Sequence, residues 1–77
     1  MDIGLLWFDK GSEQLSHKVQ RAAKRYKERF GQQANVCYVH PEALPEGSQK
    51  VGKIWLRTSS RVLRHHLWVG YEHPQER

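Results

Sequence analysis

The stretch EQLSHKVQRAAKRYKERF, residues 13–30, decides the fold of this chain. Its apolar side chains recur every three or four residues, which is the period of one face of an α-helix. These apolar positions are Leu15, Val19, Ala22, Ala23, Tyr26 and Phe30. Ser12 is placed to cap the first turn, and Gly31 follows as a left-handed terminator. The pattern predicts an amphipathic helix over residues 13–30.

Four short segments rich in apolar, β-branched and aromatic residues flank this helix, one before it and three after it. They are residues 3–8 (IGLLWF), 35–40 (NVCYVH), 51–58 (VGKIWLRT) and 66–72 (HLWVGYE). Such segments are typical of strands, whereas residues 41–48 hold two prolines and a glycine and are expected to form a loop. The first two strands are expected to be parallel, because a helix connects them. The order β-α-β-β-β predicts an α+β domain with one helix on one face of a four-stranded mixed sheet.

Length and composition limit the class of protein. The chain has 77 residues, which is enough for one small domain with a thin core over residues 1–72 and a polar tail over 73–77. The single cysteine excludes the small secreted domains that depend on internal disulfides. The sequence has neither an apolar run of membrane-spanning length nor the basic start of a signal peptide. These features favour a cytoplasmic protein.

Positive charge is concentrated in two blocks of the chain, residues 12–30, which contain the predicted helix, and residues 51–77. The chain carries 13 Lys and Arg against 8 Asp and Glu, for a net charge of +5. At 100° per residue, four cations fall on one flank of the helix, which we call the basic helix stripe: Lys18, Arg21, Arg25 and Arg29. Cations four residues apart repel each other, and few acidic neighbours are available in the sequence to relieve them. The stripe is interpreted as a solvated face or as a row of phosphate contacts.

The predicted sheet has a second face that the helix does not cover. Because side chains alternate along a strand, residues that do not face the helix line this helix-free face. The alternation assigns to it Tyr38, His40, Lys53, Trp55, Arg57, His66 and Trp68. In the first strand the choice stays open, since Ile3, Leu5 and Trp7 compete with Leu6 and Phe8 for the inner side. No predicted element covers this face.

Two functional hypotheses follow from the helix-free face. The first is a non-catalytic interaction module that forms a homo-oligomer through this face, with Trp55 and Trp68 as its anchors, because exposed aromatic patches commonly mark interfaces. The second is nucleic-acid binding, through the aromatic and basic side chains of the face or through the basic helix stripe. Neither hypothesis implies a cofactor or a small-molecule ligand.

Metal binding and catalysis have weaker support. Cys37 and His40 have a C-x-x-H spacing, but residues three apart on a strand point to opposite faces, and one thiol makes a poor metal site. A third hypothesis is a small hydrolase or nuclease, because Asp9 and His40 follow two strands that are expected to be parallel and to end at the same edge. The segment Asp9–Ser12 matches no phosphate-binding motif, so the sequence favours a protein that is not an enzyme.

Overall fold

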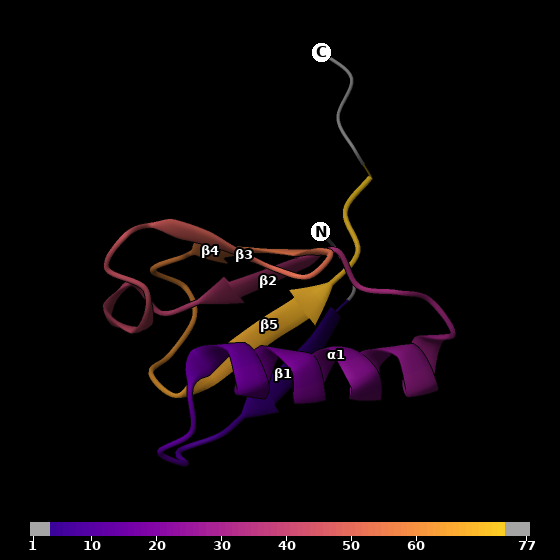
Figure 1. Ribbon diagram of the computed structural model, residues 1–77, viewed down its shortest axis with the longest axis horizontal. Coiled ribbons are helices and arrows are strands. Elements are labelled where there is room, and N and C mark those ends of the chain that lie inside the picture. Colours follow the sequence, from indigo (N-terminus) through magenta and orange to yellow (C-terminus); the bar gives the residue numbers. More distant parts are fainter. Residues whose placement is uncertain (1–3, 74–77) are drawn as a thin grey trace.

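A computed structural model describes residues 4–73, which form a five-stranded sheet with one α-helix packed against it (Figure 1). The elements in chain order are β1 Gly4–Phe8, α1 Leu15–Phe30, β2 Val36–Val39, the short 3₁₀ helix η1 Pro41–Ala43, β3 Ser48–Val51, β4 Ile54–Thr58 and β5 His66–Gly70. The predicted α+β class is confirmed. Ile3 and residues 74–77 of the predicted tail lie outside the described residues.

The strands lie in the order β1-β5-β2-β4-β3. The β2–β4 pair is parallel and the other three neighbouring pairs are antiparallel. β1 and β2 therefore run in the same direction, as a strand–helix–strand unit requires, but they do not touch. The last strand, β5, is inserted between them and pairs with both.

The sheet has one strand more than predicted, because the segment over residues 51–58 is a hairpin and not a single strand. β3 begins at Ser48, inside the predicted loop, and β4 begins at Ile54. A two-residue turn joins them, and its first residue, Gly52, has φ 59°, a left-handed value that glycine adopts without strain. Val51 and Ile54 pair directly across this turn.

The predicted capping residue of α1 is wrong at the N-terminal end of the helix and confirmed at the C-terminal end. Its first residue is Leu15, and Gln14 occupies the N-cap position without a side-chain hydrogen bond, so the expected capping role of Ser12 was wrong. Ser12 lies two residues before the N-cap position, next to a turn that Asp9 closes: the Asp9 Oδ1 accepts a hydrogen bond from the Gly11 N–H at 2.8 Å. At the other end the prediction is confirmed: Gly31 has φ 71° and donates its N–H to the Lys27 carbonyl at 2.7 Å.

The core lies between α1 and one face of the sheet. The helix contributes Val19, Ala22, Ala23 and Tyr26, and it packs mainly on β5 and β1 (Figure 1). The inner face of the sheet contributes Val51, Cys37, Val39, Ile54, Leu56, Leu67 and Val69. Leu5 and Trp7 pack against this core, whereas Leu6 and Phe8 are each 56% exposed. The structure thereby resolves the face of the first strand that the sequence left open.

Cys37 is fully buried in this core, and burial raises the pKa of its thiol from 9.0 to about 12. Because the unfolded chain ionises the thiol from about pH 9.0 and the folded chain does so only near 12, its ionisation lowers the free energy of unfolding as the pH rises through this range. At neutral pH the folded protein holds Cys37 as an inert thiol.

We expect native protein to react with an aromatic disulfide reagent ~1,000-fold more slowly than urea-unfolded protein, because labelling of a buried thiol requires opening of the core. The rate of thiolate release measures this directly, and the unfolded protein is the control. Rapid labelling in native buffer would show that the region around β2 opens far more easily than the packing of Cys37 indicates.

Candidate functional site

The helix-free face carries one continuous row of side chains across all five strands. The strand registers place Leu6 of β1 opposite Trp68 of β5, Trp68 opposite Tyr38 of β2, Tyr38 opposite Arg57 of β4, and Arg57 opposite Ser48 of β3. Side chains directly opposite on one face of a sheet are neighbours. Three of the predicted site residues are therefore brought side by side at the centre of the face, in the order Trp68, Tyr38, Arg57.

Aromatic rings also lie on both sides of this row. Phe8 and His66 pair across β1 and β5 with ring centroids 4.9 Å apart. Two residues further along β4, Trp55 is 46% exposed, and the Lys50 ammonium of β3 lies 5.1 Å from the centroid of its ring. The face thus presents aromatic side chains from four of the five strands, with cations on the β3–β4 side.

Trp68 leans over β1, where a glycine makes room for its indole. A Cβ atom placed on Gly4 would lie 2.9 Å from Cε2 and 3.1 Å from Nε1 of Trp68. Any other residue at position 4 would push the ring away, since real Cβ contacts are almost never this short. The absence of a side chain at Gly4 therefore determines where the half-buried Trp68 ring lies.

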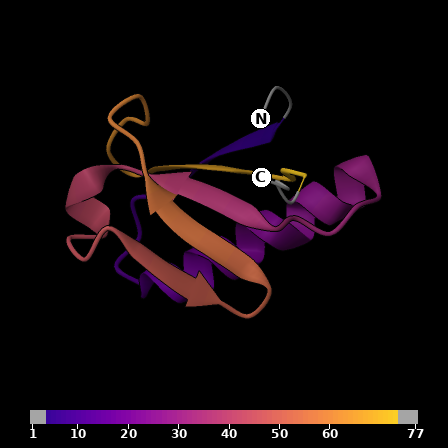
Figure 2. The same ribbon diagram turned by 90° about the horizontal axis from the view of Figure 1, so that it is seen from above.

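The helix-free face is not fully open, which corrects the expectation that nothing covers it. Residues 59–65, between β4 and β5, rise on the side of the sheet away from α1, where they form the orange loop of Figure 2. The Ser59 carbonyl accepts a hydrogen bond from the Val62 N–H at 3.1 Å, and its hydroxyl accepts one from the Arg61 N–H at 3.2 Å. This turn leaves Val62 only 8% exposed, although it lies outside the main core.

A pocket of about 470 Å³ lies between this loop and the sheet. We call it the loop pocket; its lining residues are Leu6, Tyr38, Ser59, Arg61, Val62, Leu63, His66, Trp68 and Glu72. Tyr38, His66 and Trp68 were assigned to this face by strand alternation. The loop residues were not, because alternation does not apply outside strands.

Glu72 joins the pocket through a double hydrogen bond with Asn35. The Asn35 amide donates to the Glu72 carbonyl at 2.7 Å and accepts from the Glu72 N–H at 2.8 Å. This clip ties the chain after β5 to the residue before β2. It places the Glu72 carboxylate 2.8 Å from the Tyr38 hydroxyl, which donates to it. Burial, together with this hydrogen bond and the charge of Glu72, raises the pKa of Tyr38 above its ordinary value of 10.0.

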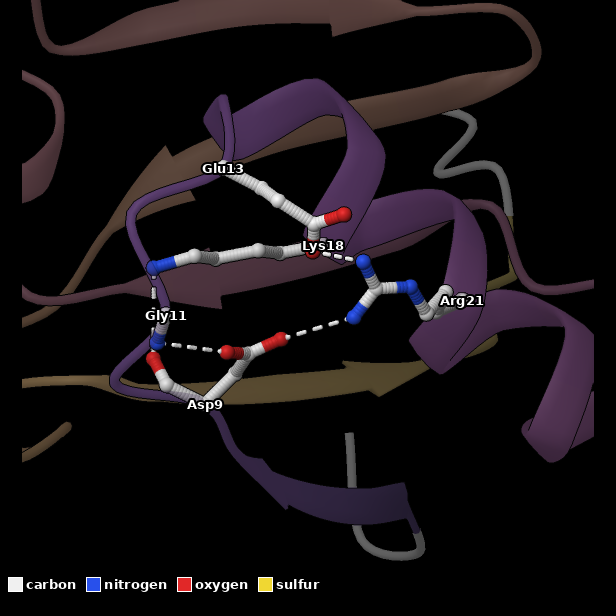
Figure 3. Close-up of polar contacts among 5 residues, drawn as sticks. All are labelled: Asp9, Gly11, Glu13, Lys18 and Arg21. Carbon is white, nitrogen blue, oxygen red and sulfur yellow. Dashed lines mark hydrogen bonds and ion pairs between the residues drawn. The ribbon is translucent and has the colours of Figure 1, made fainter.

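Asp9, one of the two catalytic candidates, instead joins the loop between β1 and α1 to the helix (Figure 3). Its side chain is 13% exposed, and its Oδ2 lies 3.2 Å from the Arg21 guanidinium. Arg21 also pairs with Glu13, and the Lys18 ammonium donates to the Asp9 carbonyl at 3.3 Å. These contacts fix the path of the loop into α1 and neutralise part of the basic helix stripe.

The rest of the basic helix stripe is also partly compensated, which corrects the expectation that its cations have few acidic neighbours. Arg25 lies 3.6 Å from Glu28, and the Arg29 guanidinium lies 5.8 Å from the centroid of the Phe30 ring. The stripe belongs to α1, on the opposite side of the sheet from the loop pocket (Figure 2). The basic helix stripe and the cations of the helix-free face therefore do not form one surface.

The structure does not bring Asp9 and His40 together. The two strands they follow are parallel and end at the same edge, as predicted, but β5 lies between them. Two strand spacings separate the strand ends by about 10 Å. The His40 imidazole accepts a hydrogen bond at Nδ1 from the Glu42 N–H at 3.0 Å and thereby caps η1. Each residue makes a local contact that stabilises a turn.

Lys53, which strand alternation assigned to the helix-free face, lies elsewhere. Lys53 is in the turn between β3 and β4, so its side chain does not follow strand alternation; it lines a groove beside α1, with Lys24 and Lys27. Lys53 is therefore absent from the helix-free face.

Within residues 4–73, no group of three or more His, Cys, Asp and Glu side chains is placed to hold a metal ion. In the same residues no helix has the length and apolar character needed to cross a bilayer.

The Tyr38–Glu72 contact can be tested by titration. We expect Glu72→Gln to lower the pKa of Tyr38 toward 10.0, because the amide keeps an acceptor oxygen but removes the negative charge that disfavours the tyrosinate. The ring carbon resonances of Tyr38 report its ionisation. Because the folded pKa is raised, this contribution to stability is complete below pH 10 and is lost as the pH rises further. Glu28→Gln removes the same charge from α1 and is expected to leave Tyr38 unchanged; an equal shift in both variants would contradict the contact.

Comparison with known proteins does not identify a relative of this chain. No protein-family model matches the sequence, and neither a curated protein nor a solved structure is significantly similar to it. The chemistry of the helix-free face and of the sheet edges is therefore the basis for assigning a function.

Proposed function

We propose that this chain is a non-catalytic interaction module that forms a homodimer, and that two copies pair through β1 and the adjoining part of the helix-free face. The observation that carries the proposal is the outer edge of β1. This strand stands at one end of the sheet, and it combines exposed apolar side chains with backbone groups that no other strand within residues 4–73 pairs.

The direction of the β1 backbone groups follows from one hydrogen bond. The Asp9 N–H donates to the His65 carbonyl at 2.9 Å, so this pair is a hydrogen-bonded pair of the antiparallel β1–β5 ladder. Hydrogen-bonded and non-hydrogen-bonded pairs alternate along such a ladder. Leu5 and Trp7 therefore direct their N–H and C=O groups toward β5. Gly4, Leu6 and Phe8 direct theirs away from the sheet.

The side chains of β1 do not protect this edge of the sheet from pairing with another chain. Its sequence, GLLWF, contains no charged residue and no proline, and Leu6 and Phe8 are each 56% exposed. Natural sheets usually shield an open edge with charges, prolines or bulges. The opposite edge, β3, follows that rule, since its sequence SQKV carries Lys50 and three of its four residues are exposed. The structure therefore favours β1 as the pairing edge.

The edge of β1 is complementary to itself. Antiparallel pairing about a two-fold axis at Leu6 places Leu6 opposite its equivalent and Phe8 opposite Gly4 of the second copy. The Trp68 indole already fills the space above Gly4, so the Phe8 ring of the second copy would meet an aromatic surface there, and aromatic cross-strand pairs are stabilising. A second copy is thus the occupant that this edge fits.

We expect the protein to be a dimer in solution, and the double variant Leu6→Lys/Phe8→Lys to be a monomer that keeps its fold. The two lysines bring like charges together at the pairing edge, where charges oppose association. Light scattering behind a sizing column gives the mass, and circular dichroism checks the fold. Gln49→Lys adds a charge to the opposite, already polar edge and is expected to stay dimeric. A monomeric native protein would overturn the proposal.

Hydrogen exchange separates edge pairing from other dimers. In an edge-paired dimer the Leu6 and Phe8 amides are protected, because they donate to the second copy. In the double variant these two positions exchange rapidly, while Leu5 and Trp7 remain protected by β5. A dimer in which the Leu6 and Phe8 amides exchange rapidly would show that the copies associate through another surface.

A further inference from the structure

We infer that the helix-free face binds single-stranded nucleic acid, with one base in the loop pocket and the phosphates on the cations between this pocket and Trp55. The inference does not depend on pairing through β1. It rests on three observations: the shape of the loop pocket, the polar groups on its wall, and the order of aromatic and basic side chains across the face.

The lining and the volume of the loop pocket are compatible with a planar base. Trp68 and Tyr38 are neighbours on the sheet and supply aromatic surface, while Leu6 and Val62 close it from β1 and from the loop. Its volume of about 470 Å³ lies within the usual range for sites that take a small organic group. Unstacked bases of single strands bind to proteins by stacking on aromatic side chains in this way.

The polar groups of the pocket suit the edge of a base. The Glu72 carboxylate lies on the wall and is held in place by the Asn35 clip and the Tyr38 hydroxyl. A carboxylate accepts hydrogen bonds from the amino group of a base, as acidic side chains do with cytosine N4. The Ser59 hydroxyl is on the same lining. The pocket is therefore matched to a base that donates from its edge.

Cations lie where a strand leaving the pocket would pass. Arg57 is next to Tyr38 in the central row, Arg61 is on the pocket lining, and Lys50 lies beside Trp55. All three are exposed, so a negatively charged backbone reaches them without being buried. The combination of a basic path with stacking platforms is typical of proteins that bind single strands.

The spacing of Trp68 and Trp55 favours a strand over a single nucleotide. The registers place them two strands apart and two residues apart along the strands, or about 12 Å at the standard spacings of a sheet. This distance is several times the rise of ~3.4 Å between stacked bases, so an extended strand with splayed bases spans both rings. Lys50, now over Trp55, is placed to move from the ring to a phosphate.

The basic helix stripe is less suited to this role. Arg21 is paired with Asp9 and Glu13, and Arg25 is paired with Glu28. Bound phosphates would have to compete with these carboxylates. On the helix-free face, by contrast, Arg57 and Arg61 lie beside the loop pocket, so cations and stacking surface adjoin.

The test measures binding of a fluorescently labelled oligo-deoxycytidine by anisotropy at several salt concentrations. We expect weak binding, with a Kd of roughly 10⁻⁴–10⁻⁶ M, and log Kobs that falls linearly with log salt. Arg57→Glu is expected to weaken binding ~10-fold or more and to flatten the salt slope. Arg25→Glu changes charge by the same amount on α1 and is the matched control. Weakening by Arg25→Glu alone would move the site to the helix and overturn the inference.

The indole N–H resonances provide an independent readout of the same titration. Trp55 and Trp68 lie on the helix-free face, whereas Trp7 packs against the core on the helix side. We expect the oligonucleotide to shift the first two indole signals and leave the Trp7 signal in place. Absence of binding at low salt, or signals of Trp55 and Trp68 that do not move, would overturn the inference. Cytidine monophosphate bound as tightly as the oligonucleotide would also overturn it, because the site would then be for a single nucleotide.

These outcomes are distinct from those for the homodimer. Arg57 lies at the centre of the face, three strands away from β1 in the sheet order. Arg57→Glu is therefore expected to leave the mass of the dimer unchanged while it weakens nucleic-acid binding. A native monomer that binds the oligonucleotide would contradict the homodimer alone, and a dimer that does not bind it would contradict the inference alone.

Discussion

The structure depends on one constraint: a single helix must cover a five-stranded sheet. α1 has 16 residues and is ~24 Å long but only ~10 Å wide, whereas five strands are about 19 Å across. The helix therefore lies on β5 and β1 and leaves a groove of about 520 Å³ against the β3–β4 hairpin, lined by Ala23, Val51 and Ile54 among others. In the described part of the chain, no α-helix covers the other face of the sheet. Its aromatic side chains are covered only in part, by the loop over residues 59–65.

Two kinds of contact stabilise the helix-free face, although no second layer of structure packs on it. Val62 closes the loop on one end, and the Asn35–Glu72 double hydrogen bond fixes the chain after β5 on the other. The first lies in the loop that joins β4 directly to β5, and the second joins residues 35 and 72, which flank β2 and β5. They leave the rings between them accessible and hold the walls of the loop pocket at a defined separation. In so small a domain, the shape of this surface thus depends on a loop and on hydrogen bonds to the backbone, and not on a large hydrophobic core beneath it.

The parts of this fold that could be predicted from the sequence are those that depend on local periodicity. The helix followed from the spacing of Val19, Ala22 and Tyr26, and the assignment of Tyr38, Arg57 and Trp68 to the helix-free face followed from strand alternation. Their order in one row did not, because it depends on the order of the strands. The β3–β4 hairpin was missed because Gly52 interrupts an otherwise alternating segment without a second turn residue. Leu6 and Phe8 could not be placed because both faces of the segment over residues 3–8 are apolar. Glu72 and the loop pocket could not be found at all, because they depend on pairing between residues distant in the sequence.

The position of β5 also has a consequence for biosynthesis. β5 is the last of the five described strands in chain order, yet it is in the interior of the sheet, between β1 and β2, and it is also a main support of α1. A nascent chain that lacks His66–Gly70 can pair β2, β4 and β3, but it has no partner for β1 and lacks much of the surface on which α1 packs. Until β5 leaves the ribosome, the apolar segment around Leu6 and Trp7 is exposed to other chains and to chaperones. The half of the sheet that carries β1 and α1 is therefore completed only after β5 has been synthesised.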